Sequence, residues 1–197
     1  MHGAEGMAVR KSNEEAARTR EAIVAAAADR IRRTEIAETS LAEVMAAAGL
    51  THGGFYRHFR DKEQLVAEAL SAAGDKAAAS IGRKMEKGGV NAAIDGYLTR
   101  SHRDSPAPLC PFAAIGSELA RSGGEARRQA RDVLERLFAT LADGASGREA
   151  RGRAIVTLST MVGAMTLARI ASPTPLSEEI LKSAKDHLRR RRSEPEP

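Results

Sequence analysis

The sequence predicts an all-α protein, on the evidence of its residue types and of its apolar spacing. Of its 197 residues, 42% are apolar, which is enough for a sizeable core, yet only 3% are aromatic and Trp is absent. Ala, the strongest helix former, is abundant, whereas Val, Ile and Tyr are sparse over most of the length. These proportions favour helices throughout, in one compact unit or in two successive domains.

The helical spacing divides the chain into four segments. Residues 1–13 have no apolar period, so we expect a flexible N-terminal arm. Apolar positions at helical spacing begin at residue 14, and the first helix ends at two arginines, which suit a helix C-terminus. Short helices then give way to longer ones near Gly74. We therefore expect domains over 14–74 and 75–190, followed by a flexible tail over 191–197.

Two short helices in the first domain are separated by a turn at Gly49. The first, over 41–48, follows Ser40, and Glu43 stands three residues later as in a capping box. The second begins at Thr51 and ends near residue 59. The turn and the two helix lengths are typical of a helix-turn-helix, in which five apolar residues would pack the pair together. These are Val44, Ala48, Leu50, Phe55 and Phe59.

The second short helix contains two adjacent glycines beside several hydrogen-bond donors. Gly53 and Gly54 each cost about 1 kcal/mol relative to Ala inside a helix, which a purely structural helix has little reason to tolerate. Their missing side chains allow close approach to a DNA groove, and His52, Tyr56 and His58 offer contacts to bases and phosphates. The alternative is a strained turn with no role in recognition.

A longer motif around these helices resembles the signature of the TetR/AcrR family. The matching runs lie between about residues 19 and 70 and are Thr39-Ser40-Leu41, Ala47-Ala48-Gly49-Leu50-Thr51, Gly54-Phe55-Tyr56-Arg57-His58-Phe59 and Lys62-Glu63. The resemblance implies a three-helix DNA-binding domain followed by a larger helical domain that binds an effector and dimerises. It also implies a transcriptional regulator, usually a repressor, that leaves a palindromic double-stranded operator when a small molecule binds.

The resemblance assigns DNA contacts residue by residue. It implies phosphate contacts from Thr39, Tyr56, His58 and Lys62, and base contacts from Thr51, His52 and Gly53. Ser40 completes the candidate DNA-binding set. Met45 stands where many members have Ala, so we expect a perturbed but intact contact between the two short helices.

The charge distribution gives DNA binding little additional support. The net charge is +5, but residues 1–62 carry ten Lys and Arg against nine Asp and Glu, while residues 182–192 hold six basic side chains. This near balance argues against a non-specific architectural DNA binder. An enzyme has little support either, because the sequence shows no phosphate-binding glycine loop and no metal-spaced His and Cys cluster. We expect no catalytic site, metal or cofactor.

The C-terminal part offers fewer specific signals. The run over 154–171 is the most apolar in the chain, but three threonines and Arg169 make a membrane span a poor interpretation. By resemblance this helix and the next, over 178–190, form the dimer bundle, and an ordinary core helix is the alternative. With one cysteine and no secretory signal pattern, we expect a cytoplasmic protein.

Six residues are candidates for an effector pocket, and an ordinary core is the alternative interpretation of most of them. They are Tyr97, His102, Cys110, Phe112, Met161 and Met165. Cys110 precedes Pro111, which suits the first position of a helix, so the thiol would stand at an N-cap. The helix dipole there lowers a thiol pKa and favours reaction with electrophiles or oxidants. A redox- or electrophile-sensing regulator is therefore the alternative function, and a small buried apolar side chain is the alternative role of Cys110.

Overall fold

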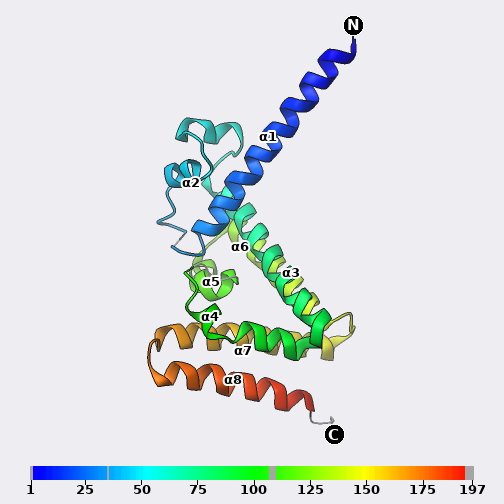
Figure 1. The fold of residues 1–197 in the computed structure, drawn as a ribbon, viewed down its shortest axis with the longest axis vertical. Helices are drawn as coiled ribbons and strands as arrows, with labels where there is room; N and C mark the ends of the chain where they lie inside the picture. The colour runs from blue at the N-terminus through cyan, green and yellow to red at the C-terminus, as the bar shows by residue number, and fades with distance from the viewer. Residues whose placement is uncertain (1, 35, 107–109, 194–197) are drawn as a thin grey trace.

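A computed structural model describes residues 2–34, 36–106 and 110–193 of the chain, and within these ranges it contains helices and no β-strand. The helices in chain order are α1 (His2–Arg30), α2 (Leu41–Ala47), the 3₁₀ helix η1 (His52–Arg57), α3 (Lys62–Tyr97), α4 (Arg100–Arg103), α5 (Pro111–Arg121), α6 (Gly124–Ala142), α7 (Arg148–Ile170) and α8 (Pro175–Ser193). The all-α prediction is confirmed. Figure 1 shows α1 and α2 at one end of the molecule and the α7–α8 pair at the other, with α3 and α6 joining them.

Both ends of the chain are more helical than the sequence predicts. Helix α1 begins at His2, so it includes most of the expected flexible arm, and it projects beyond the neighbouring elements in Figure 1. Propagating an existing helix adds one hydrogen bond for each residue fixed, so a segment without apolar period can continue a helix anchored elsewhere. That anchor is the buried face that carries Ile23 and Ala27. Helix α8 likewise continues to Ser193, and the rest of the expected tail, residues 194–197, lies outside the described residues.

Helix α3 is long and contains a sharp break. It runs through Gly74, where the sequence suggests a domain boundary, and departs from helical geometry at Gly88 and Gly89. Gly89 has φ 63° and ψ −162°, a conformation that is essentially restricted to glycine. The break separates a first leg, residues 62–87, from a second leg, residues 90–97. Side chains from both legs line one small pocket, so the two legs converge.

Two clusters of buried side chains follow one another along the molecule. The first lies between α1, α2, η1 and the start of α3, and extends along α3 to Ala73. The second begins at Ala77 and includes buried side chains of α6, α7 and α8. Helices α5 and α6 contribute to the first cluster as well, through Ile115 and Ala126 among others. The two clusters are therefore joined by shared helices, and no linker separates them.

Helix α7 is apolar on a buried face and on an exposed face. By length and composition it is the one helix in the described ranges that could cross a membrane. It packs against α6 and α8, and Leu158, Met161 and Met165 are fully buried in the second cluster. One face of α7 is therefore packed in the core, as expected for a helix that does not span a membrane, while its opposite face is exposed.

Candidate DNA-binding site

The turn between α2 and η1 brings two short elements together as a helix-turn-helix. Gly49 adopts φ 75° just after α2, and the Leu50 amide donates to the Met45 carbonyl at 2.9 Å, which reverses the chain direction. The five residues expected to pack this pair are all buried or half-buried: Val44, Ala48, Leu50, Phe55 and Phe59. Two of the aromatic rings, Phe55 and Phe59, stack with centroids 5.5 Å apart. The packing part of the prediction is therefore confirmed.

Polar side chains cover the outer face of η1. Tyr56 is 70% exposed and its ring lies edge-on to buried Phe55, with centroids 5.1 Å apart, so the base of the side chain is held while the hydroxyl is free to reach outward. His52 and Arg57 are also exposed. Arg57 belongs to the motif that resembles the family signature, but it is not among the DNA contacts expected from the sequence. Its positive charge within that motif would have been enough to suggest a phosphate contact. This face can contact both bases and phosphates.

The two glycines of η1 have different surroundings. A Cβ atom placed on Gly53 would meet no described atom within 4 Å, so this backbone is open to a surface outside the protein. A Cβ on Gly54 would lie 3.7 Å from the Met45 methyl carbon. Met45 is fully buried, and this distance is an ordinary van der Waals contact. No contact among the described residues therefore requires glycine at position 53 or 54, and Gly53 leaves the backbone open to solvent.

The N-terminus of α2 differs from the expected capping box. Ser40 occupies the N-cap position but makes no capping hydrogen bond within the described residues. Glu43 instead accepts a hydrogen bond from Arg30 of α1 at 2.5 Å, which draws its carboxylate away from the helix end. The hydroxyls of Ser40 and of Thr51, the N-cap of η1, are thus not used in capping. Thr39 is only 3% exposed, so its side chain offers little surface to a phosphate.

The start of α3 lies beside the segment that precedes α2. The Lys62 ammonium donates to the Ala37 carbonyl at 3.1 Å, which places a positive charge near residues 39 and 40. Asp61 caps α3 by accepting from the Gln64 amide at 2.8 Å. The Arg60 guanidinium, followed by the Gln64 amide, lowers the pKa of the Asp61 carboxyl. The capping carboxylate therefore stays ionised, and the positive charge of Arg60 compensates its negative charge.

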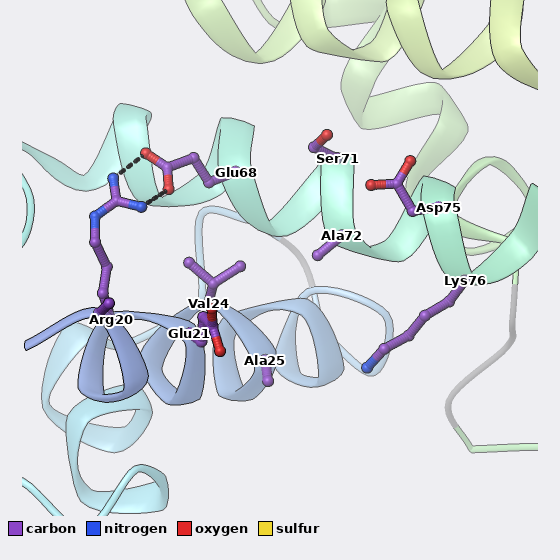
Figure 2. A pocket seen from close by; sticks show the side chains of 10 residues that line it. Arg20, Glu21, Val24, Ala25, Glu68, Ser71, Ala72, Asp75 and Lys76 are labelled. Carbon is purple, nitrogen blue, oxygen red and sulfur yellow. Dashed lines mark hydrogen bonds and ion pairs between the residues drawn. The ribbon is translucent and has the colours of Figure 1, made fainter. Parts of the chain in front are cut away.

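Helix α1 supports the end of η1 through Arg20. Its guanidinium lies over the Phe59 ring, 4.7 Å from the centroid, and its Nε donates to the His58 carbonyl at 3.4 Å. Figure 2 shows the same guanidinium crossing from α1 to the Glu68 carboxylate of α3, on one side of a groove between the two helices. His58 itself is half-buried. The sequence alone gives no signal for Arg20, because its partners lie about forty residues away.

The six candidate effector residues do not share one cavity. Tyr97 and His102 line a polar pocket between the two legs of α3 and α4. Phe112 lines a separate apolar groove between α5, α6 and α7. Met161 and Met165 are fully buried, which favours the ordinary core interpretation for these two residues.

Cys110 has the predicted position and the opposite chemistry. It is the N-cap of α5, and Pro111 opens the helix. The thiol is 2% exposed, and burial raises its pKa despite the Tyr97 hydroxyl and the backbone amides of Ala113 and Phe112, which lower it. The expected lowering of the pKa is therefore wrong, because loss of water outweighs the helix end. Burial is a tertiary property that the local motif does not reveal.

Comparison with known proteins assigns the family. Residues 23–69 match the family described as bacterial regulatory proteins, tetR family. An uncharacterised HTH-type transcriptional regulator of Mycobacterium tuberculosis is 31% identical over 174 residues, which are 80% of this chain and 88% of that protein. The chain belongs to the TetR family. TetR-family proteins are soluble transcriptional regulators, not enzymes; they bind operator DNA and act as dimers.

Other relatives show how the similarity is distributed along this TetR-family chain. The HTH-type transcriptional regulator TtgR of Pseudomonas putida is 39% identical over 64 residues, which are 32% of this chain and 30% of TtgR. A TetR transcriptional regulator from Chloroflexus aurantiacus, solved by crystallography, has 28% identity and a TM-score of 0.67, covering 89% of this chain and 94% of that one. The fold extends over nearly the whole chain, while the higher identity to TtgR is confined to a short segment.

Proposed function

We propose that this TetR-family chain is a cytoplasmic repressor that binds a palindromic operator as a homodimer and leaves it when a small molecule binds. The observation that carries the proposal is the outer face of η1, where exposed Tyr56 and His52 stand on a base of buried Phe55 and Phe59. Such a face reads DNA only if it is held rigidly, and the packing beneath supplies that rigidity. Family membership supports the DNA partner.

The proposed contacts divide into base readers and phosphate binders. Base reading is assigned to η1 and its cap, because these side chains and the open backbone face outward: Thr51, His52 and Gly53. Phosphate binding is assigned to hydroxyl and basic groups around them: Ser40, Tyr56, Arg57, His58 and Lys62. Buried Thr39 is given a positioning role for the segment before α2. The first group sets sequence preference and the second sets overall affinity.

An apolar face of α7 supports the proposed homodimer. Val156, Leu167 and Ile170 are exposed on this helix, Ile170 by 76%, and Gly163 lies between them without a side chain. Leu176 extends the apolar surface at the start of α8. Adjacent exposed apolar side chains on paired helices are typical of a dimer interface. A second copy of this face would bury them.

Small-molecule release has better support than sensing through Cys110. The thiol is buried and burial raises its pKa, so little thiolate is available to react. We therefore assign Cys110 a packing role in the wall behind Tyr97.

The experiment compares two alanine variants on an operator selected from random duplexes and on a scrambled duplex. His52→Ala should lose about 1–3 kcal/mol on the operator and little on the scrambled sequence, because a lost base contact removes discrimination. Lys62→Ala should weaken binding to both duplexes. It should also reduce the slope of log affinity against log salt concentration by about one, as expected for the loss of one phosphate contact. Lys87→Ala, exposed at the far end of the first leg of α3, is the control and should change neither. Equal losses on both duplexes for His52→Ala would remove the base-reading role.

A further inference from the structure

A small pocket with both polar and apolar lining lies in the angle between the two legs of α3 and α4. Its volume is 230 Å³, below the roughly 300–1,000 Å³ that holds drug-sized ligands. Ser80 and Lys84 line it from the first leg, Tyr97 from the second leg, and His102 from α4. Its lining within the described residues is rich in hydroxyl groups and contains no carboxylate. The pocket therefore suits a small polar ligand that carries no positive charge.

His102 lines this pocket and carries a buried hydrogen-bond acceptor without a partner among the described residues. Its Nδ1 lies 2.8 Å from the Tyr97 carbonyl oxygen, and a carbonyl only accepts, so Nδ1 carries the proton. Burial lowers the pKa of His102, which keeps the ring neutral and leaves a lone pair on Nε2. Nε2 is buried and has no hydrogen-bond partner among the described residues. A buried acceptor of this kind calls for a donor from a ligand or a water.

Tyr97 adds a second under-used polar group to the same wall. Its hydroxyl is buried, lies beside the weakly hydrogen-bonding Cys110 thiol, and has no other partner in the described part of the chain. The Tyr97 and His102 rings pack edge to face with centroids 4.4 Å apart. The two polar groups are thus fixed with respect to one another, as a binding site requires.

Lys84 is a half-buried cation on the opposite leg. Its Nζ donates to the Gly96 carbonyl at 3.2 Å, and no carboxylate within the described ranges forms an ion pair with it. Burial, followed by the charge of Arg83, lowers the pKa of Lys84. An anionic group from a ligand would stabilise the charged ammonium.

We propose that this pocket binds a small hydroxylated carboxylate, whose hydroxyl donates to His102 Nε2 and whose carboxylate pairs with Lys84. The inference rests on the proposed function because it takes this ligand to be the effector that releases the repressor from DNA. The apolar groove beside Phe112 is a poorer effector site, because Gly163 and Leu167 belong both to it and to the proposed dimer face.

The test measures binding to the full-length protein in the absence of DNA, by calorimetry and by thermal unfolding. The probes are sodium salts in matched pairs that differ by one hydroxyl: lactate and propionate, 3-hydroxybutyrate and butyrate, malate and succinate. At least one hydroxy acid should bind about tenfold or more tightly than its partner, since a hydrogen bond to a buried acceptor is gained. Absence of binding by all three hydroxy acids overturns the proposal.

Three variants separate the two contacts from a general effect. Lys84→Gln should weaken the hydroxy acid about tenfold or more, whereas Lys87→Gln, on the same leg and exposed, should bind it as the wild type does. His102→Asn keeps a donor for the Tyr97 carbonyl but loses Nε2, so the preference for the hydroxylated acid should disappear. Wild-type binding by Lys84→Gln, or a preference that persists in His102→Asn, contradicts the site. If Lys84→Gln or His102→Asn fails to fold, the other variant and the matched pairs of acids still test the proposed site.

A separate titration distinguishes this proposal from the proposed function. Operator binding is measured for the wild type with and without the hydroxy acid. If the protein binds the acid but no operator, the proposed pocket is supported and the proposed repressor function is contradicted. If it binds its operator but none of the acids, the repressor function is supported and the proposed pocket is contradicted.

Discussion

At the scale of single residues, Gly74 decides how closely α3 and α6 approach. A Cβ atom at this position would lie 2.5 Å from Val133 Cγ1 and 2.6 Å from Cγ2, far inside normal van der Waals contact. Both residues are buried in the packed region between the two helices. Gly82, about two turns later on α3, has more room, because its Cβ would lie 4.0 Å from Thr140. The two glycines therefore provide a matched pair.

We expect Gly74→Ala to lower the free energy of unfolding by about 1–3 kcal/mol, because the added methyl overpacks the contact with Val133. Gly82→Ala should be neutral or should stabilise the protein by up to about 1 kcal/mol, since Ala favours helix and meets no close atom. Urea unfolding of both variants measures the difference. Val133→Ala in the Gly74→Ala background should recover part of the loss. No recovery would show that the cost arises elsewhere than at Val133.

The residues of the site show where sequence reasoning succeeds and where it ends. The roles of Phe55 and Phe59 follow from helical spacing, because spacing fixes which face of a short helix is apolar. The raised pKa of Cys110, opposite to the expected lowering, does not follow from the sequence, because the burial of the thiol depends on helices far along the chain. Tyr97 and Met161 were expected in one pocket, but Tyr97 lines a pocket and Met161 is fully buried in the core, a difference that helical spacing cannot show.

At the scale of elements, α5 is hydrogen-bonded to the segment between α1 and α2. The Glu118 carboxylate accepts from the backbone amides of Ile36 at 2.9 Å and Ala37 at 3.1 Å. The Ala37 carbonyl in turn accepts from Lys62, a proposed phosphate contact. This chain of contacts connects a helix of the C-terminal part with the DNA-binding site. It is a bridge that spans more than eighty residues of sequence.

We expect Glu118→Ala to expose the Ile36 and Ala37 amides and to lower the free energy of unfolding by about 1.5–3 kcal/mol, as for hydrogen bonds to a charged group. Hydrogen exchange at these two amides should accelerate. Glu149→Ala is the matched control, because its partner Arg153 lies one turn away on the surface of α7. It should leave both amides protected. Unchanged exchange in Glu118→Ala would mean that this bridge does not order the segment.

Element boundaries were predictable only where the signal is local. Gly49 ends α2 through neighbours within a few residues, and the sequence predicts this turn. The capping box at Ser40 was not formed, because Glu43 binds Arg30, thirteen residues earlier. Longer-range competition of this kind is invisible to a motif of four residues.

At the scale of the whole molecule, DNA binding and dimerisation are assigned to opposite ends. Figure 1 shows α2 near one end of the long axis and the α7–α8 pair at the other, with α3 and α6 between them. Figure 1 shows α7 away from α2, so in the proposed dimer a second copy can pack on α7 and leave both DNA-binding faces open. A palindromic operator requires two such faces at a fixed separation. In this proposal the dimer face controls operator affinity without touching DNA.

We expect Leu167→Glu to convert the proposed dimer into a monomer, because Leu167 is 56% exposed on the apolar face of α7 and a carboxylate there would be buried among apolar side chains at the interface. Size-exclusion chromatography with light scattering measures the mass. Operator affinity should fall by at least about a hundredfold, since each half-site is then bound independently. Ala139→Glu, which adds the same charge at an exposed position of α6, should remain dimeric and keep its affinity. A Leu167→Glu protein that stays dimeric would place the interface elsewhere, and a monomer with unchanged operator affinity would separate dimerisation from DNA recognition.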